Sequence, residues 1–421
     1  MTGKTIDVNG RAYAWPQEPL VVICCDGSEP AYMDVARQQG IMPNLERILG
    51  NGEAYLAKSV IPSFTNPNNL SIVTGRPPAV HGICGNYLID PETGQEVMMN
   101  DPKFLRAPTI FANFQGAGAK VAVVTAKDKL RLLLGKGLSF GDGSAVSFSS
   151  EKADQCTMDG HGIENVCEMV GMGVPEVYSA ELSEFVFAAG VKLLGSMRPD
   201  LMYLSTTDYV QHKYAPGSDG ANAFYAMMDK YLGELDAGGA AIVLTADHGM
   251  KDKHLADGEP DVIYLQDVFD DWLGKDAAKV ILPITDPYVV HHGALGSFAT
   301  VYLPEGADVA ELVDRVKALD GIDACYDRAE GCRVFELPED RTGDMIVVSG
   351  GVAHTKVIGT SADKHDLSGL NEPLRSHGGM SEQVVPIIMN RKTVDLPNDL
   401  RNFDAFLVGC NHLVHMAEAA E

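Results

Sequence analysis

Two short segments that lie far apart in the chain each combine an aspartate with a histidine at a spacing suited to a metal ion. Asp208 and His212 are four residues apart in TTDYVQH, so both side chains can face the same ion on a helical turn. Asp247 and His248 are adjacent in TADHGM, where the following glycine avoids steric crowding. Carboxylates and neutral imidazoles are ligands that zinc-like cations bind in proteins. These two segments therefore predict a metal site.

A third aspartate, a third histidine and a threonine extend this set toward two metals and a nucleophile. Asp26 follows the apolar run LVVICC, His377 lies in SHGGM, and Thr65 lies in the turn-rich segment SFTNPNN. A metal lowers the pKa of a neighbouring hydroxyl and makes it a nucleophile, while the amino terminus of a helix attracts an anionic group. Together these residues predict phosphoryl-type chemistry at two cations. The alternative for Thr65 is a helix cap, which is a common place for threonine.

Two lysines and an asparagine are candidates for binding the rest of an anionic substrate. Lys127 and Lys129 follow the apolar run KVAVV in TAKDK, and they can point the same way if the strand conformation persists. The net charge of −25 would repel an anion from the protein as a whole, so these lysines would have to attract it locally. Their alternative is a pair of solvated lysines on a loop. Asn86, in HGICGN, is suited to donate to a phosphoryl oxygen, although an isolated asparagine is more often a turn residue.

The polar residues are set within a regular alternation of apolar, strand-like segments and helical segments along the chain. The alternation predicts an α/β fold with a doubly wound, mostly parallel sheet. We expect strands at 20–26, 71–75, 120–128, 200–208, 240–249 and 384–390, and helices at 42–52, 107–118, 180–196 and 221–239. Ligands of open α/β sheets bind outside the carboxyl ends of the strands. Four of the polar residues stand just past such ends, which predicts that they meet at one edge: Asp26, Lys127, Asp208 and Asp247.

The pattern of apolar and polar residues changes after residue 250. Shorter strand-like runs (FATVYLP, CRVFELP and MIVVSG) and the helical run VAELVDRVKAL predict a small α+β insertion. We expect the catalytic core at 1–259 and 369–421, and a cap domain at 260–368. His291 and His292 are candidates for lining the cap side of the site, with an exposed loop pair as the alternative. The sequence does not define the oligomeric state, although an exposed cap would suit a homodimer.

Composition excludes several classes of protein. Hydrophobic residues make up 45% of the 421 residues, which is ordinary for a globular protein with a large core. No apolar run approaches the roughly 20 residues of a membrane span, and the start of the chain lacks a signal-peptide pattern. The eight cysteines have no CxxC or disulfide-like spacing, which favours reduced thiols. The acidic balance argues against nucleic-acid binding. We therefore expect a cytoplasmic protein with neither membrane nor nucleic acid as a partner.

Taken together, the motifs resemble those of one branch of a known superfamily. SFTNPNNLSIVTGRPPAVHGICGN resembles the nucleophile segment of the nucleotide pyrophosphatase/phosphodiesterase branch of the alkaline phosphatase superfamily. DGSEP, TTDYVQHKYAPG, ADHGM and SHGGM follow in the superfamily's order of metal-binding segments. The resemblance covers essentially the whole core, and it implies an alkaline-phosphatase-like fold with the insertion as a cap. Alkaline phosphatases themselves use serine with a phosphate-binding arginine and often magnesium, whereas this chain has Thr65 and no third-metal motif.

The resemblance also assigns roles to the residues above. It implies two zinc ions per chain, one held by Asp208, His212 and His377 and the other by Asp26, Asp247 and His248, with Thr65 as hydroxyl ligand and nucleophile. Asn86 matches the asparagine that binds the phosphoryl group in this branch.

Within the branch, the chain is most similar to hydrolases that split the carbon–phosphorus bond of phosphonoacetate into acetate and phosphate. Breaking this bond expels a carbanion, which requires the adjacent carboxylate to take up the charge and cations to stabilise it there. Lys127 and Lys129 are suited to this role. We therefore expect a di-zinc hydrolase of phosphonate catabolism that acts on a small phosphonate through a phosphothreonine at Thr65.

Three other functions stay open. A nucleotide pyrophosphatase/phosphodiesterase of the same superfamily would use the same metals and Thr65, but it would need an aromatic or apolar slot for a base. A metal-dependent phosphomutase would need a sugar-acid pocket that the sequence does not reveal. A binding protein that senses phosphonates would keep the metal ligands without needing a hydroxyl at Thr65. Manganese or iron could also occupy sites of this ligand type, so the physiological metal does not follow from the sequence.

Overall fold

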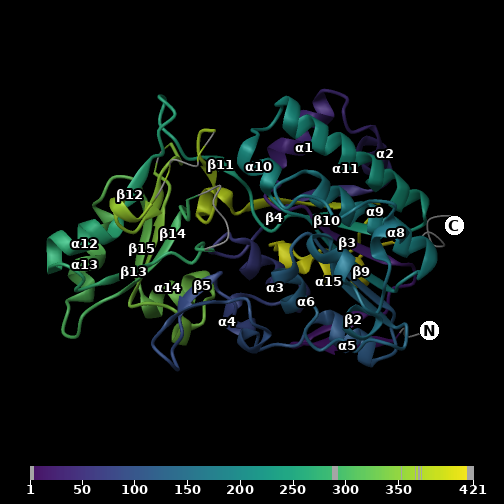
Figure 1. The fold of residues 1–421 in the computed structure, drawn as a ribbon, viewed down its shortest axis with the longest axis horizontal. Helices are drawn as coiled ribbons and strands as arrows, with labels where there is room; N and C mark the ends of the chain where they lie inside the picture. The colour runs from purple at the N-terminus through teal and green to yellow at the C-terminus, as the bar shows by residue number, and fades with distance from the viewer. Residues whose placement is uncertain are drawn as a thin grey trace.

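The computed structural model describes residues 4–286, 293–351, 353–365, 367, 370 and 372–414. A seven-stranded sheet forms the centre of the larger lobe (Figure 1). Its strands, in spatial order, are β4 (Glu53–Lys58), β19 (Val384–Met389), β10 (Ala241–Thr245), β3 (Leu20–Cys24), β9 (Leu201–Ser205), β7 (Val121–Thr125) and β8 (Ala145–Ser149). The five strands from β10 to β8 run parallel, whereas β19 is antiparallel to both of its neighbours. The predicted α/β fold is confirmed, with a mixed edge added to the parallel block.

Helices cover both faces of this sheet, which explains why the parallel strands are apolar throughout. Every residue of the five parallel strands is buried, as expected when both faces are covered. Along β3, Leu20, Val22 and Cys24 belong to one apolar cluster, and Val21 and Ile23 belong to the other. One face packs against α3 (Thr65–Thr74), α5 (Ile110–Gly116), α6 (Asp128–Leu134) and α15 (Ala405–Asn411). The opposite face packs against α1 (Pro30–Gln38), α2 (Pro43–Asn51), α9 (Glu181–Ser196) and α11 (Asp219–Ala237).

A second, antiparallel sheet forms a smaller lobe beside the first (Figure 1). Its strands, in spatial order, are β13 (Lys279–Ile281), β14 (Phe298–Tyr302), β16 (Met345–Ser349) and β15 (Ile322–Asp327). Helices α12 (Leu265–Leu273), α13 (Val309–Lys317) and α14 (Arg328–Phe335) accompany it, and β12 (Val262–Tyr264) pairs with β17 (Val357–Gly359). These elements fall within 260–368. The apolar core is continuous between the lobes, since Phe64 packs edge-on against Phe298 with ring centroids 6.4 Å apart. The domain boundaries therefore stay a prediction.

Two predicted strands are helical in the structure. Residues 71–75 form the end of α3 and its left-handed cap at Gly75, and residues 67–74 of that helix are buried. An apolar run that is buried on all sides has no helical periodicity, which is why it resembled a strand. The segment CRVFELP, also predicted as a strand, lies largely in α14. That helix begins where the side chain of Asp327 accepts a hydrogen bond from the backbone of Glu330 at 2.8 Å.

No helix within the described ranges combines the length and the apolar character that crossing a membrane requires.

Candidate active site

The structure brings the six predicted metal ligands together in two clusters at the carboxyl ends of the central strands. One cluster contains Asp208, His212 and His377, and the other contains Asp26, Asp247 and His248. Within each cluster, the nearest ligand atoms lie within 4.8 Å of one another. The aspartates that follow the strands do meet at one edge of the sheet, as expected, although the roles of these residues stay predictions.

Short connections after the strands position the three aspartates. Asp26 and Asp247 each stand two residues past their strands, β3 and β10. Asp208 stands three residues past β9 and is the N-cap residue of α10 (Tyr209–Lys213), which places His212 on the next helical turn. Gly27 has a φ of 69°, and a Cβ there would meet the Cβ of Asp208 at 3.0 Å. A glycine at this position therefore allows the Asp26 connection to approach α10.

Backbone carbonyls orient the three imidazoles in the same way. The Nδ1 atom of His212 lies 2.7 Å from the carbonyl oxygen of Arg375. The corresponding distances are 2.9 Å from His248 to Gly249 and 2.7 Å from His377 to Ser63. A proton on Nδ1 leaves Nε2 as the ligand atom, which is the usual arrangement for metal-binding histidines. The Nε2 atoms do face the carboxylates: His212 lies 2.9 Å from Asp208, and His248 lies 3.3 Å from Asp26.

The electrostatics of the clusters fit a bound cation. Burial, together with the carboxylates of Asp208 and Asp247, raises the pKa of Asp26 well above its usual value. Burial likewise raises the pKa of Asp247. For Asp208, burial would raise the pKa, but His212 and the other two histidines hold it well below the usual range. The Oδ1 atom of Asp26 is buried and accepts no hydrogen bond from the described residues. A divalent cation would compensate these closely spaced carboxylates, so the residues fit the implied metals.

Thr65 lies beside the second cluster, at the first position of α3. Its Oγ1 atom is 3.3 Å from Nε2 of His248. The N-cap residue of α3 is Phe64, so Thr65 does not occupy the cap position that the alternative interpretation required. One turn later, the Asn69 amide donates to Oδ2 of Asp247 at 3.1 Å and to the carbonyl oxygen of Thr65 at 3.0 Å. Sequence analysis missed Asn69. It lies four residues after Thr65, a spacing that places two residues on the same side of a helix, and this was the available signal.

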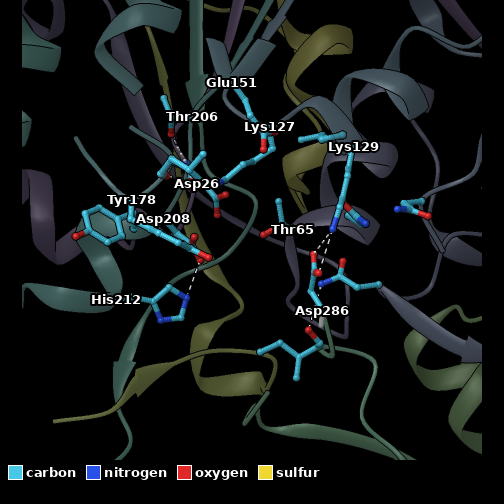
Figure 2. A pocket seen from close by; sticks show the side chains of 18 of the residues that line it. Asp26, Thr65, Lys127, Lys129, Glu151, Tyr178, Thr206, Asp208, His212 and Asp286 are labelled. Atoms are coloured by element: carbon cyan, nitrogen blue, oxygen red, sulfur yellow. Dashed lines mark hydrogen bonds and ion pairs between the residues drawn. The ribbon is translucent and has the colours of Figure 1, made fainter. Parts of the chain in front are cut away.

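Thr65 and four of the candidate metal ligands line a cavity of about 280 Å³: Asp26, Asp208, His212 and His377. Figure 2 shows Thr65 between Asp26 and Asp208 on one side and the pair formed by Lys129 and Asp286 on the other. The cavity is therefore bounded by candidate metal ligands and by cations, with the hydroxyl between them. Asn86 also lines it, and its Nδ2 atom donates to the carbonyl oxygen of Ile284 at 3.3 Å.

The two lysines reach the cavity by a different route from the predicted one. The strand β7 ends at Thr125, Lys127 is the N-cap residue of α6, and Lys129 lies in the first turn of that helix. Lys127 donates to the carbonyl oxygen of Val177 at 3.4 Å, and burial lowers its pKa below the usual value. The Lys129 Nζ atom lies 3.1 Å from both carboxylate oxygens of Asp286. Both lysines line the cavity, so they are not merely solvated loop residues.

Sequence analysis missed several of the residues that line the cavity. Asp286 approaches Lys129 from the smaller lobe, and Glu151 accepts a hydrogen bond from the backbone of Asp128 at 2.8 Å. Tyr178 and Tyr209 lie with ring centroids 6.0 Å apart. Asp286, Glu151 and Tyr178 come from segments remote from the recognisable motifs, and the tertiary fold brings them to the cavity. Tyr209 lies within TTDYVQH, next to Asp208. His291 and His292 lie outside the described residues.

Comparison with known proteins assigns the family. The model of the type I phosphodiesterase/nucleotide pyrophosphatase family matches residues 20–379. The chain belongs to this family. Among its relatives is the venom phosphodiesterase of Macrovipera lebetinus, which is 25% identical over 246 residues, covering 56% of this chain and 26% of the venom protein. The aligned region thus spans about a quarter of the length of that relative.

Solved structures extend the likeness over nearly the whole chain. Phosphonoacetate hydrolase from Sinorhizobium meliloti 1021, solved in complex with phosphonoacetate, is 66% identical, with 97% of this chain and 99% of that chain covered and a TM-score of 0.94. The same enzyme was solved with phosphonoformate. Murine ectonucleotide pyrophosphatase/phosphodiesterase 5 is 18% identical, with 94% of this chain and 97% of that chain covered and a TM-score of 0.62, and it shares the fold. The two Sinorhizobium meliloti structures confirm the resemblance to phosphonoacetate hydrolase, and the family model confirms the wider family.

Proposed function

We propose that this protein is a zinc-dependent hydrolase that cleaves the carbon–phosphorus bond of phosphonoacetate to acetate and phosphate. The observation that carries the proposal is the position of the Thr65 hydroxyl in one cavity. Candidate metal ligands of both clusters line this cavity with it, and so do two lysines. A phosphonate group suits the metal side, and a carboxylate suits the lysine side. The relative from Sinorhizobium meliloti supports this substrate, since it is 66% identical and was solved with phosphonoacetate.

The metals would be held by the two clusters described above. When bound, zinc ions supply positive charge that lowers the pKa of a nearby hydroxyl or water and stabilises negative charge on phosphoryl oxygens. His212, His248 and His377 present Nε2 for this purpose because backbone carbonyls engage Nδ1. Asn69 positions Asp247 through its amide.

In the first displacement, the Oγ1 atom of Thr65 attacks phosphorus and forms a phosphothreonine. The bond between phosphorus and the methylene carbon breaks, and its electron pair passes to carbon and into the adjacent carboxylate. Lys127 and Lys129 stabilise this enediolate, while the Asn86 amide donates to a phosphoryl oxygen. The proton of the Thr65 hydroxyl passes to water, and water donates one proton to the carbon, which gives acetate.

In the second displacement, water attacks phosphorus of the phosphothreonine. The bond between phosphorus and Oγ1 breaks, the Thr65 hydroxyl regains a proton, and phosphate leaves. The chain returns to its starting state, so one water is consumed for each phosphonoacetate cleaved.

The smaller lobe would act as the cap of this site. Asp286 pairs with Lys129, and the carbonyl oxygen of Pro283 accepts a hydrogen bond from the backbone of Asn86 at 2.7 Å. The segment that precedes β14 therefore contacts two of the proposed substrate-binding residues. The cap boundaries at 260–368, the homodimer and the cytoplasmic location stay predictions.

A comparison of two substrates tests the proposal. We expect phosphate release from phosphonoacetate to exceed nucleotide release from a nitrophenyl nucleotide ester by about 100-fold or more in kcat/KM, because the lysines match a carboxylate. The nucleotide phosphodiesterase stays the second candidate, since Tyr178 and Tyr209 line the cavity and offer an aromatic surface. A preference for the nucleotide ester would reject the first proposal in favour of the second.

Replacing the lysines should separate carboxylate recognition from phosphoryl chemistry. We expect Lys127→Met and Lys129→Met each to lower kcat/KM for phosphonoacetate by about 100-fold, because each removes a cation that stabilises the developing enediolate. Hydrolysis of nitrophenyl phosphate, which has no carboxylate, should change little. Lys120→Met is the matched control, because Lys120 is exposed just before the opposite end of β7. Equal losses on both substrates would contradict the assigned role.

A further inference from the structure

A completely buried ion pair lies behind the metal-ligand clusters. The Nζ atom of Lys253 is 2.9 Å from Oε1 of Glu382, and both side chains are 0% exposed. Neither residue lines the cavity or belongs to either cluster. A buried pair of this kind contributes little net stability compared with apolar residues of similar volume, so its presence calls for another explanation.

The pair joins the two loops that carry histidines of different clusters. Lys253 follows His248 by five residues, and Glu382 follows His377 by five residues. The two loops are also joined by backbone pairing, since β11 (Lys251–Asp252), just before Lys253, pairs antiparallel with β18 (Arg375–Ser376), just before His377. The imidazoles of His248 and His377 stack with centroids 3.7 Å apart and an interplanar angle of 7°. The relative position of the two loops therefore determines the distance between the two clusters.

Glu382 also binds backbone near these ligands, and Lys253 binds backbone of the smaller lobe. Glu382 accepts a hydrogen bond at Oε2 from the backbone of Gly379 at 2.9 Å, and its carbonyl oxygen accepts one from the backbone of Gly249 at 2.7 Å. Gly249 is the residue after His248, and Gly379 is two residues after His377. Lys253 donates a second hydrogen bond to the carbonyl oxygen of His354, in the smaller lobe, at 2.8 Å. One ion pair thus links both histidine loops to the region of the proposed cap.

We propose that Lys253 and Glu382 are positioning residues that fix the spacing of the two metal sites. The inference rests on the proposed function only in that two metals bind. When either residue is changed, the charge left on its partner stays buried, and the two loops lose the link that holds His248 and His377 in register. Metal affinity should fall even though every ligand is retained, as happens when outer partners of ligands are removed.

Zinc affinity of the full chain, measured by competition with a chromogenic chelator, tests this inference. We expect wild type to bind two zinc ions, and Lys253→Met and Glu382→Gln each to weaken zinc binding by about tenfold or more. The double variant should be no worse than either single variant, because the two residues act as one unit. Glu382→Gln keeps an acceptor for Gly379 and so provides a test even if Lys253→Met does not fold.

Asp229→Ala is the control for a purely structural effect. Asp229 is a buried carboxylate that accepts hydrogen bonds from the backbones of Asn44 and Leu45 at 3.0 and 2.7 Å, away from both clusters. We expect it to lower the melting temperature and to leave zinc affinity unchanged. If Lys253→Met and Glu382→Gln behave like this control, the inference is overturned. If wild type binds two zinc ions but does not cleave phosphonoacetate, the proposed function fails while the positioning role stands.

Discussion

Thr65→Ala should abolish turnover of phosphonoacetate while the protein still binds its metals. The hydroxyl supplies the oxygen that bonds to phosphorus, and loss of a covalent nucleophile commonly lowers kcat by about 10⁴-fold or more. Metal binding should persist because three other ligands surround each site, and His248, Asp26 and Asp247 keep their partners. Phosphate release under saturating substrate and zinc content by elemental analysis are the two measurements.

The matched variant is Thr65→Ser, which keeps the hydroxyl at the same position of α3. We expect it to keep substantial activity and to accumulate a phosphorylated peptide on acid quench, as the wild type should. Full activity of Thr65→Ala would remove Thr65 from the reaction. Loss of zinc from Thr65→Ala together with loss of activity would instead make the threonine chiefly a ligand.

The meeting of the three aspartates at one edge of the sheet could be predicted from general features of α/β sheets, whereas the grouping of the ligands into two clusters came from the resemblance to the family. Asp26, Asp208 and Asp247 lie directly after apolar strands, and parallel neighbouring strands end at the same edge. The short spacing between Asp208 and His212 needs one helical turn, which α10 provides. In these cases a local pattern and a topological rule were together sufficient.

Other parts of the site depend on tertiary packing that local patterns do not encode. The apolar run of α3 resembled a strand because its residues are buried on every side. Lys127 and Lys129 reach the cavity from the start of α6, where the chain had been expected to continue as a strand. Asp286 comes from the smaller lobe, shortly after β13, and nothing in its local sequence indicates that it meets Lys129. Pairings between remote segments were thus the part that the sequence left open.

Removing the metals should both inactivate the protein and destabilise it. The carboxylates of Asp26 and Asp247 are almost fully buried, with side chains 4% and 0% exposed, and the carboxylate of Asp208 in the other cluster adds to the repulsion on Asp26. Without a cation, burial and mutual repulsion raise the pKa of Asp26, so the metal-free pocket takes up protons that metal binding would release. A ligand present at about 1,000 times its Kd stabilises the folded state by about 4 kcal/mol for each site. Dialysis against a chelator should therefore lower the melting temperature by several degrees and abolish phosphate release.

Restoring zinc to the dialysed protein should recover both properties, and the direction of the pH effect provides an independent check. Because protons compete with metal for Asp26, zinc affinity should fall as the pH is lowered toward the raised pKa of that carboxyl.

His377→Ala is the informative variant, since it removes one ligand of the Asp208 cluster and leaves Asp26, Asp247 and His248 in place. It should bind a single zinc ion tightly and show a smaller rise in melting temperature on zinc addition than wild type. Undiminished activity in protein shown to be free of metal would exclude a metal role, and the buried carboxylates would then require a different counter-charge.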